Sequence, residues 1–100
     1  MRLTPKELDR LTVFTLAELA RKRRARGLKL NHPESVALIC DEIFEEARAG
    51  AAYEAVVTHA GRVLSRDDVL PGVPEMIPVV QVDALFPDGT RLVTVRTPIR

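Results

Sequence analysis

The sequence contains no tryptophan, and aromatic residues make up only 4% of its 100 positions, so a core has to be built from aliphatic side chains. Cysteine occurs once, at Cys40, which excludes an internal disulfide and favours a reducing compartment. Cys40 lies beside Ile39 and Ile43 at helical spacing, and we expect it to pack in the core as a thiol of raised pKa. These absences predict a cytoplasmic protein with an aliphatic interior.

The sequence also has no marked excess of positive or negative charge. The chain has 15 Lys and Arg residues against 14 Asp and Glu residues, which gives a formal net charge of +1. A chain so nearly neutral has no global field to attract nucleic acid or an anionic membrane, so any basic patch has to be local. No apolar run reaches the length of a signal peptide or of a membrane-spanning helix, and we therefore expect neither export nor membrane insertion.

Residues that bind metals and cofactors are scarce as well. His32 and His59 are the only histidines, and we expect both at helix ends in structural roles, because a catalytic transition-metal site needs several converging ligands. The few glycines form no phosphate-binding loop. Four closely spaced carboxylates are interpreted as the solvated face of a helix: Asp41, Glu42, Glu45 and Glu46. The residues therefore predict no catalytic, metal-binding or cofactor-binding site in this chain.

A capping box formed by Thr4 and Glu7 predicts the start of a first helix, and Gly27 predicts its end. Apolar residues cover more than one stripe of this helix: Leu8, Leu11, Val13, Phe14, Leu16, Ala17, Leu19 and Ala20. A single neighbour buries only one stripe of a helix. The pattern therefore predicts two different neighbours.

A second helix is predicted to begin at Asn31 or His32, two caps between which the sequence does not decide, and to end near Gly50. A shorter helix is predicted over residues 52–60. Ser65 is a candidate cap for one further turn. Prolines and glycine at positions 71–78 then argue against any long regular element before residue 79.

The last quarter of the chain predicts a β-hairpin. Residues 79–86 and 91–96 are strand-like, and Pro87, Asp88, Gly89 and Thr90 form the expected turn between them. Apolar residues alternate along the first strand, which predicts one dry face and one mixed face. Helices first and strands last indicate an α+β fold: an N-terminal bundle of three to four helices followed by a C-terminal β-hairpin, in one domain spanning residues 1–100.

The basic cluster Arg21–Arg26 supports a competing interpretation. A small helical nucleic-acid-binding protein could use such a cluster to contact the phosphate backbone. We favour a solvated or protein-contacting patch, because the second helix carries acidic residues where a recognition helix would face phosphate, and no aromatic residues interleave with the arginines. An autonomous small enzyme is a third alternative, which the scarcity of residues suited to catalysis disfavours.

Three blocks of sequence carry a resemblance to a known family: Leu30–Glu34, Glu75–Ile77, and Val80–Val95 with its Phe86–Thr90 turn. On these blocks, and along nearly the whole chain, the sequence resembles the gamma subunit of urease. Arg96 departs from the pattern, since the family often has His there. Residues 51–58 and 78–79 carry no recognisable family signal.

The resemblance implies a subunit of urea amidohydrolase, which converts urea and water to ammonia and carbamate. It implies two nickel ions held by the large alpha subunit and no cofactor in this chain. It also implies alpha and beta subunits as partners, in a unit that assembles around a threefold axis, (alpha-beta-gamma)3. No catalytic or metal-binding residue is carried over to this sequence, and surplus apolar surface, above all on the first helix, is expected to be interface.

Overall fold

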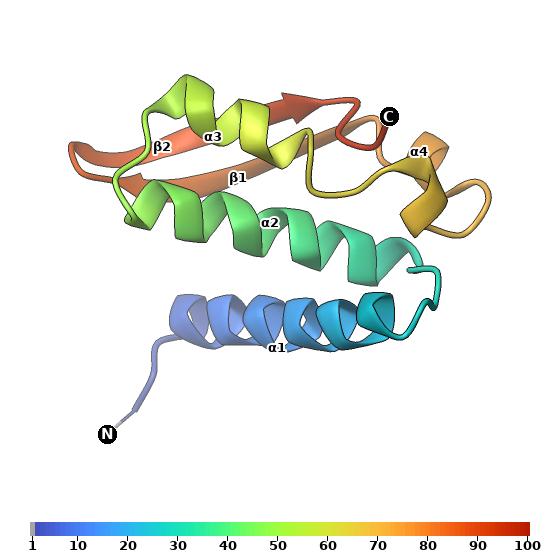
Figure 1. Ribbon diagram of the computed structural model, residues 1–100. Helices are drawn as coiled ribbons and strands as arrows, with labels where there is room; N and C mark the ends of the chain where they lie inside the picture. The colour runs from blue at the N-terminus through green and yellow to red at the C-terminus, as the bar shows by residue number, and fades with distance from the viewer. Residues whose placement is uncertain (1) are drawn as a thin grey trace.

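The computed structural model describes residues 2–100, and Figure 1 shows helices followed by an antiparallel hairpin. In chain order the elements are α1 (Pro5–Ala25), α2 (His32–Arg48), α3 (Tyr53–Ala60), a 3₁₀ turn (Arg66–Asp68), α4 (Val73–Met76), β1 (Val79–Phe86) and β2 (Gly89–Arg96). This order confirms the predicted α+β class. Across residues 2–100, no helix combines the length and the apolar character needed to traverse a bilayer.

Both long helices begin with reciprocal caps. At α1, Thr4 Oγ1 accepts from the Glu7 amide at 3.1 Å, and the Glu7 carboxylate accepts from the Thr4 amide at 2.8 Å. At α2, Asn31 Oδ1 accepts from the Glu34 amide at 3.0 Å, and Glu34 accepts from the Asn31 amide at 2.9 Å. The cap of α2 is therefore Asn31, and His32 already lies in the first turn.

The turn of the hairpin is shorter than the sequence predicts. Phe86 pairs with Gly89, so only Pro87 and Asp88 remain outside the ladder, and β2 begins at Gly89 instead of residue 91. Gly89 has a φ of +124°, which a residue with a Cβ rarely adopts. The expectation of a four-residue turn was wrong because this glycine turns the chain and pairs with β1 at the same time.

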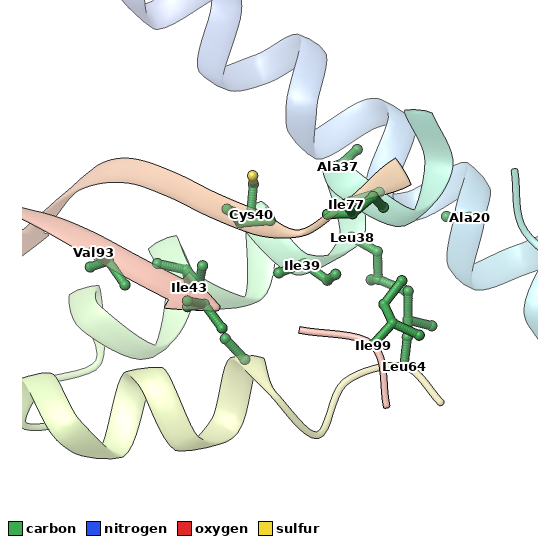
Figure 2. Packing of buried hydrophobic residues seen from close by; sticks show 14 of the residues in the cluster. Ala20, Ala37, Leu38, Ile39, Cys40, Ile43, Leu64, Ile77, Val93 and Ile99 are labelled. Carbon is green, nitrogen blue, oxygen red and sulfur yellow. The ribbon is translucent and has the colours of Figure 1, made fainter. Parts of the chain in front are cut away.

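Helix α2 is the centre of the fold. Figure 1 shows it lying between α1 on one side and the hairpin with α3 on the other. Its apolar residues meet the inner face of the hairpin in an aliphatic core, part of which Figure 2 shows. Eight of the apolar core side chains that are at most 2% exposed are Leu30, Leu38, Ile39, Ile43, Val56, Val93, Val95 and Ile99. Because aromatic residues are scarce, the core is mainly aliphatic, as predicted.

A tyrosine closes the outer edge of the hairpin. The Tyr53 hydroxyl, at the start of α3, donates to the Leu92 carbonyl at 3.0 Å and accepts from the Thr94 amide at 3.3 Å. The Arg91 guanidinium lies over the Tyr53 ring at 4.7 Å and over the Phe86 ring at 5.4 Å. An unpaired strand edge is a template for unwanted pairing, and here one side chain satisfies two of its backbone groups. We did not predict this role of Tyr53 from the sequence.

Candidate functional site

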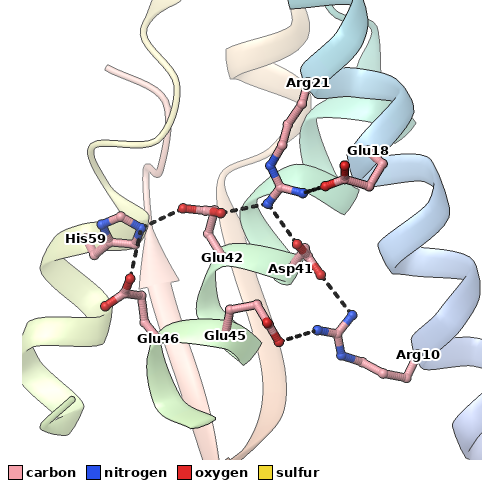
Figure 3. A network of polar contacts seen from close by, with 8 residues as sticks. All are labelled: Arg10, Glu18, Arg21, Asp41, Glu42, Glu45, Glu46 and His59. Carbon is pink, nitrogen blue, oxygen red and sulfur yellow. Dashed lines mark hydrogen bonds and ion pairs between the residues drawn. The ribbon is translucent and has the colours of Figure 1, made fainter. Parts of the chain in front are cut away.

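The histidines of the chain do not converge. His32 lies at the start of α2, and His59 lies at the end of α3, where its Nε2 is 2.8 Å from Glu42 Oε1 and 3.9 Å from Glu46 Oε1. Among residues 2–100, no group of three or more His, Cys, Asp or Glu side chains is arranged to hold a metal ion. His59 therefore belongs to a polar network between helices, shown in Figure 3.

Asp41 is the buried centre of that network. Its side chain is 1% exposed, with Oδ1 accepting from Arg10 Nη1 at 2.9 Å and Oδ2 accepting from Arg21 Nη2 at 2.7 Å. The prediction that Asp41 lies on a solvated face was therefore wrong. Helix α1 covers this face of α2 and supplies two guanidinium groups, which offset the cost of burying a carboxylate.

The other members of the carboxylate group differ from Asp41. Glu42 is half-buried and accepts from Arg21 Nη2 at 2.6 Å, so it too belongs to the network. Glu45 is 64% exposed and accepts from Arg10 Nη2 at 3.1 Å, as a surface carboxylate does. The solvated interpretation holds for Glu45, while Glu42 joins α1, α2 and α3.

A signal for the buried carboxylates was present in the sequence. Glu34 and Asp41 are seven residues apart, which places them on one face of α2, and they are 3% and 1% exposed. Arg10 and Arg21 are about three turns apart on α1, so they also share a face. Asp41 is where these two faces meet, whereas Glu34 pairs with Arg23, and the spacing alone does not show which faces of the helices are in contact.

Most basic side chains of the cluster Arg21–Arg26 form ion pairs with carboxylates of the same chain. Arg21 contacts Glu18 besides Asp41 and Glu42, Arg23 pairs with Glu34, and Arg24 pairs with Asp68 at 3.1 Å. Guanidinium groups held in this way are less free to follow a phosphate backbone. Lys22 and Arg26 are exposed and form no ion pair with residues 2–100.

Two glutamates of α2 that pair with arginines of α1 have pKa values below the usual range. Burial alone would raise the pKa of Glu34, but hydrogen bonds from the α2 cap and from Arg23 outweigh it and hold that pKa below its usual value. Burial likewise opposes ionisation of Glu42, and His59 with Arg21 outweighs it, so the pKa of Glu42 is also lowered. Both carboxylates therefore stay ionised and paired at neutral pH.

Cys40 has no chemical role visible in its surroundings. The side chain is buried among apolar residues of α2, and burial raises the pKa of its thiol to about 11. A thiol of this acidity is almost entirely protonated at neutral pH and is a poor nucleophile. The prediction that Cys40 packs in the core is confirmed.

The most distinctive surface of the molecule is the side of α1 that faces away from α2. Leu8, Leu11 and Leu19 are 52%, 48% and 38% exposed there. Thr12 and Thr15 lie between them, and we call these five residues the outer α1 face. The opposite side of the same helix buries Ala17 and Ala20 completely against the body of the chain. The predicted second apolar stripe exists, and no residue among 2–100 buries it.

An open groove lies at the other flank of α1. It has a volume of about 390 Å³ and is formed where the first half of α1 meets the end of α2 and β1. Val13, Phe44 and Leu85 contribute apolar lining, and the Arg10 guanidinium lies 4.5 Å from the centre of the Phe44 ring. The remaining six residues that line the groove are charged, and its lining includes no histidine, cysteine or serine.

The fold and these surfaces define a small α+β protein whose helices are joined by ion pairs and whose exposed apolar surface on α1 is suited to association. The family model described as "Urease, gamma subunit" matches residues 1–99. The chain belongs to the urease gamma subunit family. Its membership leaves the nucleic-acid-binding alternative without a supporting observation.

Individual relatives agree with the family model. The chain is 60% identical over 100 residues to the protein named urease subunit gamma from Laribacter hongkongensis, with both chains fully covered. It is also 56% identical over 100 residues to proteins named urease subunit gamma/beta from Pseudomonas syringae pathovars syringae and tomato, covering all of this chain and 43% of each relative.

Proposed function

We propose that this chain is a non-catalytic structural subunit of urea amidohydrolase, in which it supports the hydrolysis of urea to ammonia and carbamate. The full-length match to the gamma subunit family, with 60% identity to one relative, carries this proposal. The structure supports it, because Asp41 and Glu42, which could otherwise act on a substrate, are held in ion pairs within the chain, and His59 is hydrogen-bonded to Glu42.

The nickel ions of such an enzyme would be held by its alpha subunit. A dinickel centre needs several imidazole and carboxylate ligands around each ion. His32 and His59 lie on different helices, and His59 is bonded to Glu42, so the residues of this chain do not fit such a centre. We therefore assign no catalytic, metal-binding or cofactor-binding residue to it.

Alpha and beta subunits are the proposed partners, in a unit repeated around a threefold axis as (alpha-beta-gamma)3. The gamma/beta names of two relatives support a beta partner, because those proteins contain a gamma-like segment within a longer chain. We further propose that residues 1–100 act as one domain and that the assembly is cytoplasmic. The low cysteine content, a single Cys40, favours that location.

Co-expression tests the proposal. The chain is produced with the alpha and beta chains from the same source, with nickel supplied, and the complex is measured by light scattering during size exclusion. The expected result is a large complex that contains all three chains and hydrolyses urea, with reduced assembly or activity when this chain is omitted. The proposal would be contradicted if this chain stayed monomeric while the alpha and beta chains assembled into a fully active enzyme without it.

A further inference from the structure

Thr97 has a backbone conformation that its residue type disfavours. Its φ is +47°, and among residues 2–100 it is the only residue other than glycine with a positive φ. Threonine is β-branched, and its Cβ crowds the backbone in this left-handed region. The next residue is Pro98, which favours an extended backbone at the position before it. The side chain of Thr97 and the following proline therefore both oppose the conformation that the chain adopts here.

No contact of the Thr97 side chain explains this conformation. The side chain is exposed, and its hydroxyl forms no hydrogen bond with residues 2–100. The backbone of Thr97, in contrast, is bonded on both sides. Its amide donates to the Pro78 carbonyl at 2.8 Å, and its carbonyl accepts from Arg100 Nε at 3.1 Å. The strain is therefore maintained by where the backbone leads and not by the side chain.

The turn at Thr97 leads two apolar residues into the core. Strand β2 ends at Arg96, and Pro98 and Ile99 are fully buried directly after the turn, with Ile99 1% exposed. Ile99 and Leu64 belong to the same buried cluster, part of which Figure 2 shows. Burial of apolar groups stabilises the segment in this position and offsets the strain at Thr97.

Few other contacts hold this segment. The Arg66 amide of the 3₁₀ turn donates to the Arg100 carbonyl at 3.3 Å, and this is the one backbone hydrogen bond between residues 98–100 and the remainder of residues 2–100. Strain at Thr97 favours release of the segment, whereas burial of Ile99 favours its retention. Opposing contributions of this kind are typical of a segment that opens locally while the rest of a fold persists.

We propose that Thr97 is the strained hinge of a strap, residues 97–100, which opens and closes over the core while the helices and the hairpin stay folded. Opening relaxes the left-handed backbone, breaks the hydrogen bond between Arg66 and Arg100, and exposes Ile99. The hydrogen bond from the Thr97 amide to Pro78 keeps the start of the strap attached to the hairpin. This conformational device goes beyond the proposed function and does not depend on it.

Hydrogen exchange of the full chain, followed by nuclear magnetic resonance, measures the opening. The Arg66 amide reports on the strap, and the Val95 amide of β2 reports on unfolding of the hairpin. We expect the protection of the Arg66 amide to be at least tenfold lower than that of Val95. T97N should raise the protection of the Arg66 amide about fivefold, because asparagine tolerates a positive φ. T90N is the matched control and should not raise it, since Thr90 is an exposed threonine of β2 without a positive φ.

A thiol placed in the strap gives a second measurement. Ile99 is buried, so the thiol introduced by I99C should react with a maleimide only when the strap opens. The buried Cys40 of α2 is the internal reference, and each labelling rate is divided by the rate of the same thiol in the urea-unfolded chain. We expect the I99C thiol to react at least tenfold faster than Cys40 on this scale. Adding T97N should slow its labelling about fivefold, and adding T90N should not slow it.

The outcomes are distinct. Equal protection of the Arg66 and Val95 amides in wild type would overturn the inference, because the strap would then open only when the hairpin unfolds. Unchanged or lower protection of Arg66 in T97N would show that Thr97 is not strained, and an equal gain from T90N would show an effect of asparagine at any exposed site. Thermal unfolding shows whether I99C folds, and the exchange experiment does not require that variant. None of these results bears on the proposed function, which co-expression tests.

Discussion

Arg21 Nη2 of α1 lies 2.7 Å from Asp41 Oδ2 of α2, and the Asp41 side chain is 1% exposed. Arg10 donates to the other oxygen of the same carboxylate at 2.9 Å. One buried carboxylate therefore bonds two arginines that are about three turns apart on α1. This arrangement fixes the register of α1 along α2, and so it fixes where the outer α1 face is presented.

Removing the charge of Asp41 should loosen this contact. We expect D41N to lower the free energy of unfolding by about 2–3 kcal/mol, because two guanidinium groups lose a charged partner while their exposed sides remain in water. Urea unfolding followed by circular dichroism gives the value. The control E45Q removes an exposed carboxylate of the same network and should cost no more than about 0.5 kcal/mol. Equal effects from both variants would show that burial of Asp41 is not decisive.

Acid should weaken the ion pairs that hold α1 against the rest of the chain. The pKa values of Glu34, Glu42 and Asp68 are lowered in the folded chain, where arginines of α1 pair with each of them. Such a group stabilises the fold fully above its unfolded pKa, about 4, and that contribution disappears as pH falls through the lower folded value. The free energy of unfolding should therefore be nearly constant from about pH 7 to pH 5 and should fall below about pH 4.5.

The variant E34Q tests the origin of that acid sensitivity. Glutamine keeps the size of Glu34 but cannot titrate, so E34Q should start less stable at pH 7 and lose less stability between pH 5 and pH 3 than wild type. E54Q is the control, because Glu54 is exposed on α3 and has no ion pair with residues 2–100. An unchanged pH profile in E34Q would mean that other carboxylates carry the effect.

Tyr53 should protect the edge of β2. In Y53F the Leu92 carbonyl and the Thr94 amide lose their hydroxyl partner, and we expect a loss of about 1 kcal/mol in the free energy of unfolding. The more specific measurement is hydrogen exchange, in which the Thr94 amide should exchange faster while the buried Val93 and Val95 amides change less. Unaltered exchange at Thr94 would show that this hydrogen bond contributes no protection.

Gly89 should be intolerant of a side chain for reasons of backbone geometry alone. A Cβ at this position would meet no atom within 4 Å, but its φ is +124°. We expect G89A to cost about 2 kcal/mol in thermal or urea unfolding. G61A is the matched control, because Gly61 has a φ of −76° and its Cβ would lie at an ordinary 3.7 Å from its neighbours, so stability should be unchanged or slightly raised.

Local sequence rules predicted much of this fold. The box formed by Thr4 and Glu7 and the stop at Gly27 were correct because each depends on residues within one or two turns. The sequence did not decide whether Asn31 or His32 caps α2, because either residue can stand at the start of a helix. Only the observed hydrogen bonds identify Asn31 as the cap.

The interactions that the sequence analysis missed depend on distant residues. Asp41 looked solvated because a pattern of charges on α2 does not show which helix covers it. The role of Tyr53 was not predicted because its partners on β2 lie about forty positions further along the chain. For the candidate site, the wide apolar surface of α1 was readable from spacing alone, whereas the pairing of most of the Arg21–Arg26 cluster required the tertiary structure.

We expect this chain to support urea hydrolysis without performing it. The most direct measurement compares ammonia release from urea by the purified chain, by the alpha and beta chains together, and by all three, each with the same nickel supply. We expect no ammonia release by the chain alone and full activity in the three-chain complex. Sustained ammonia release by the purified chain would contradict a non-catalytic role, because its residues would then be sufficient for the reaction.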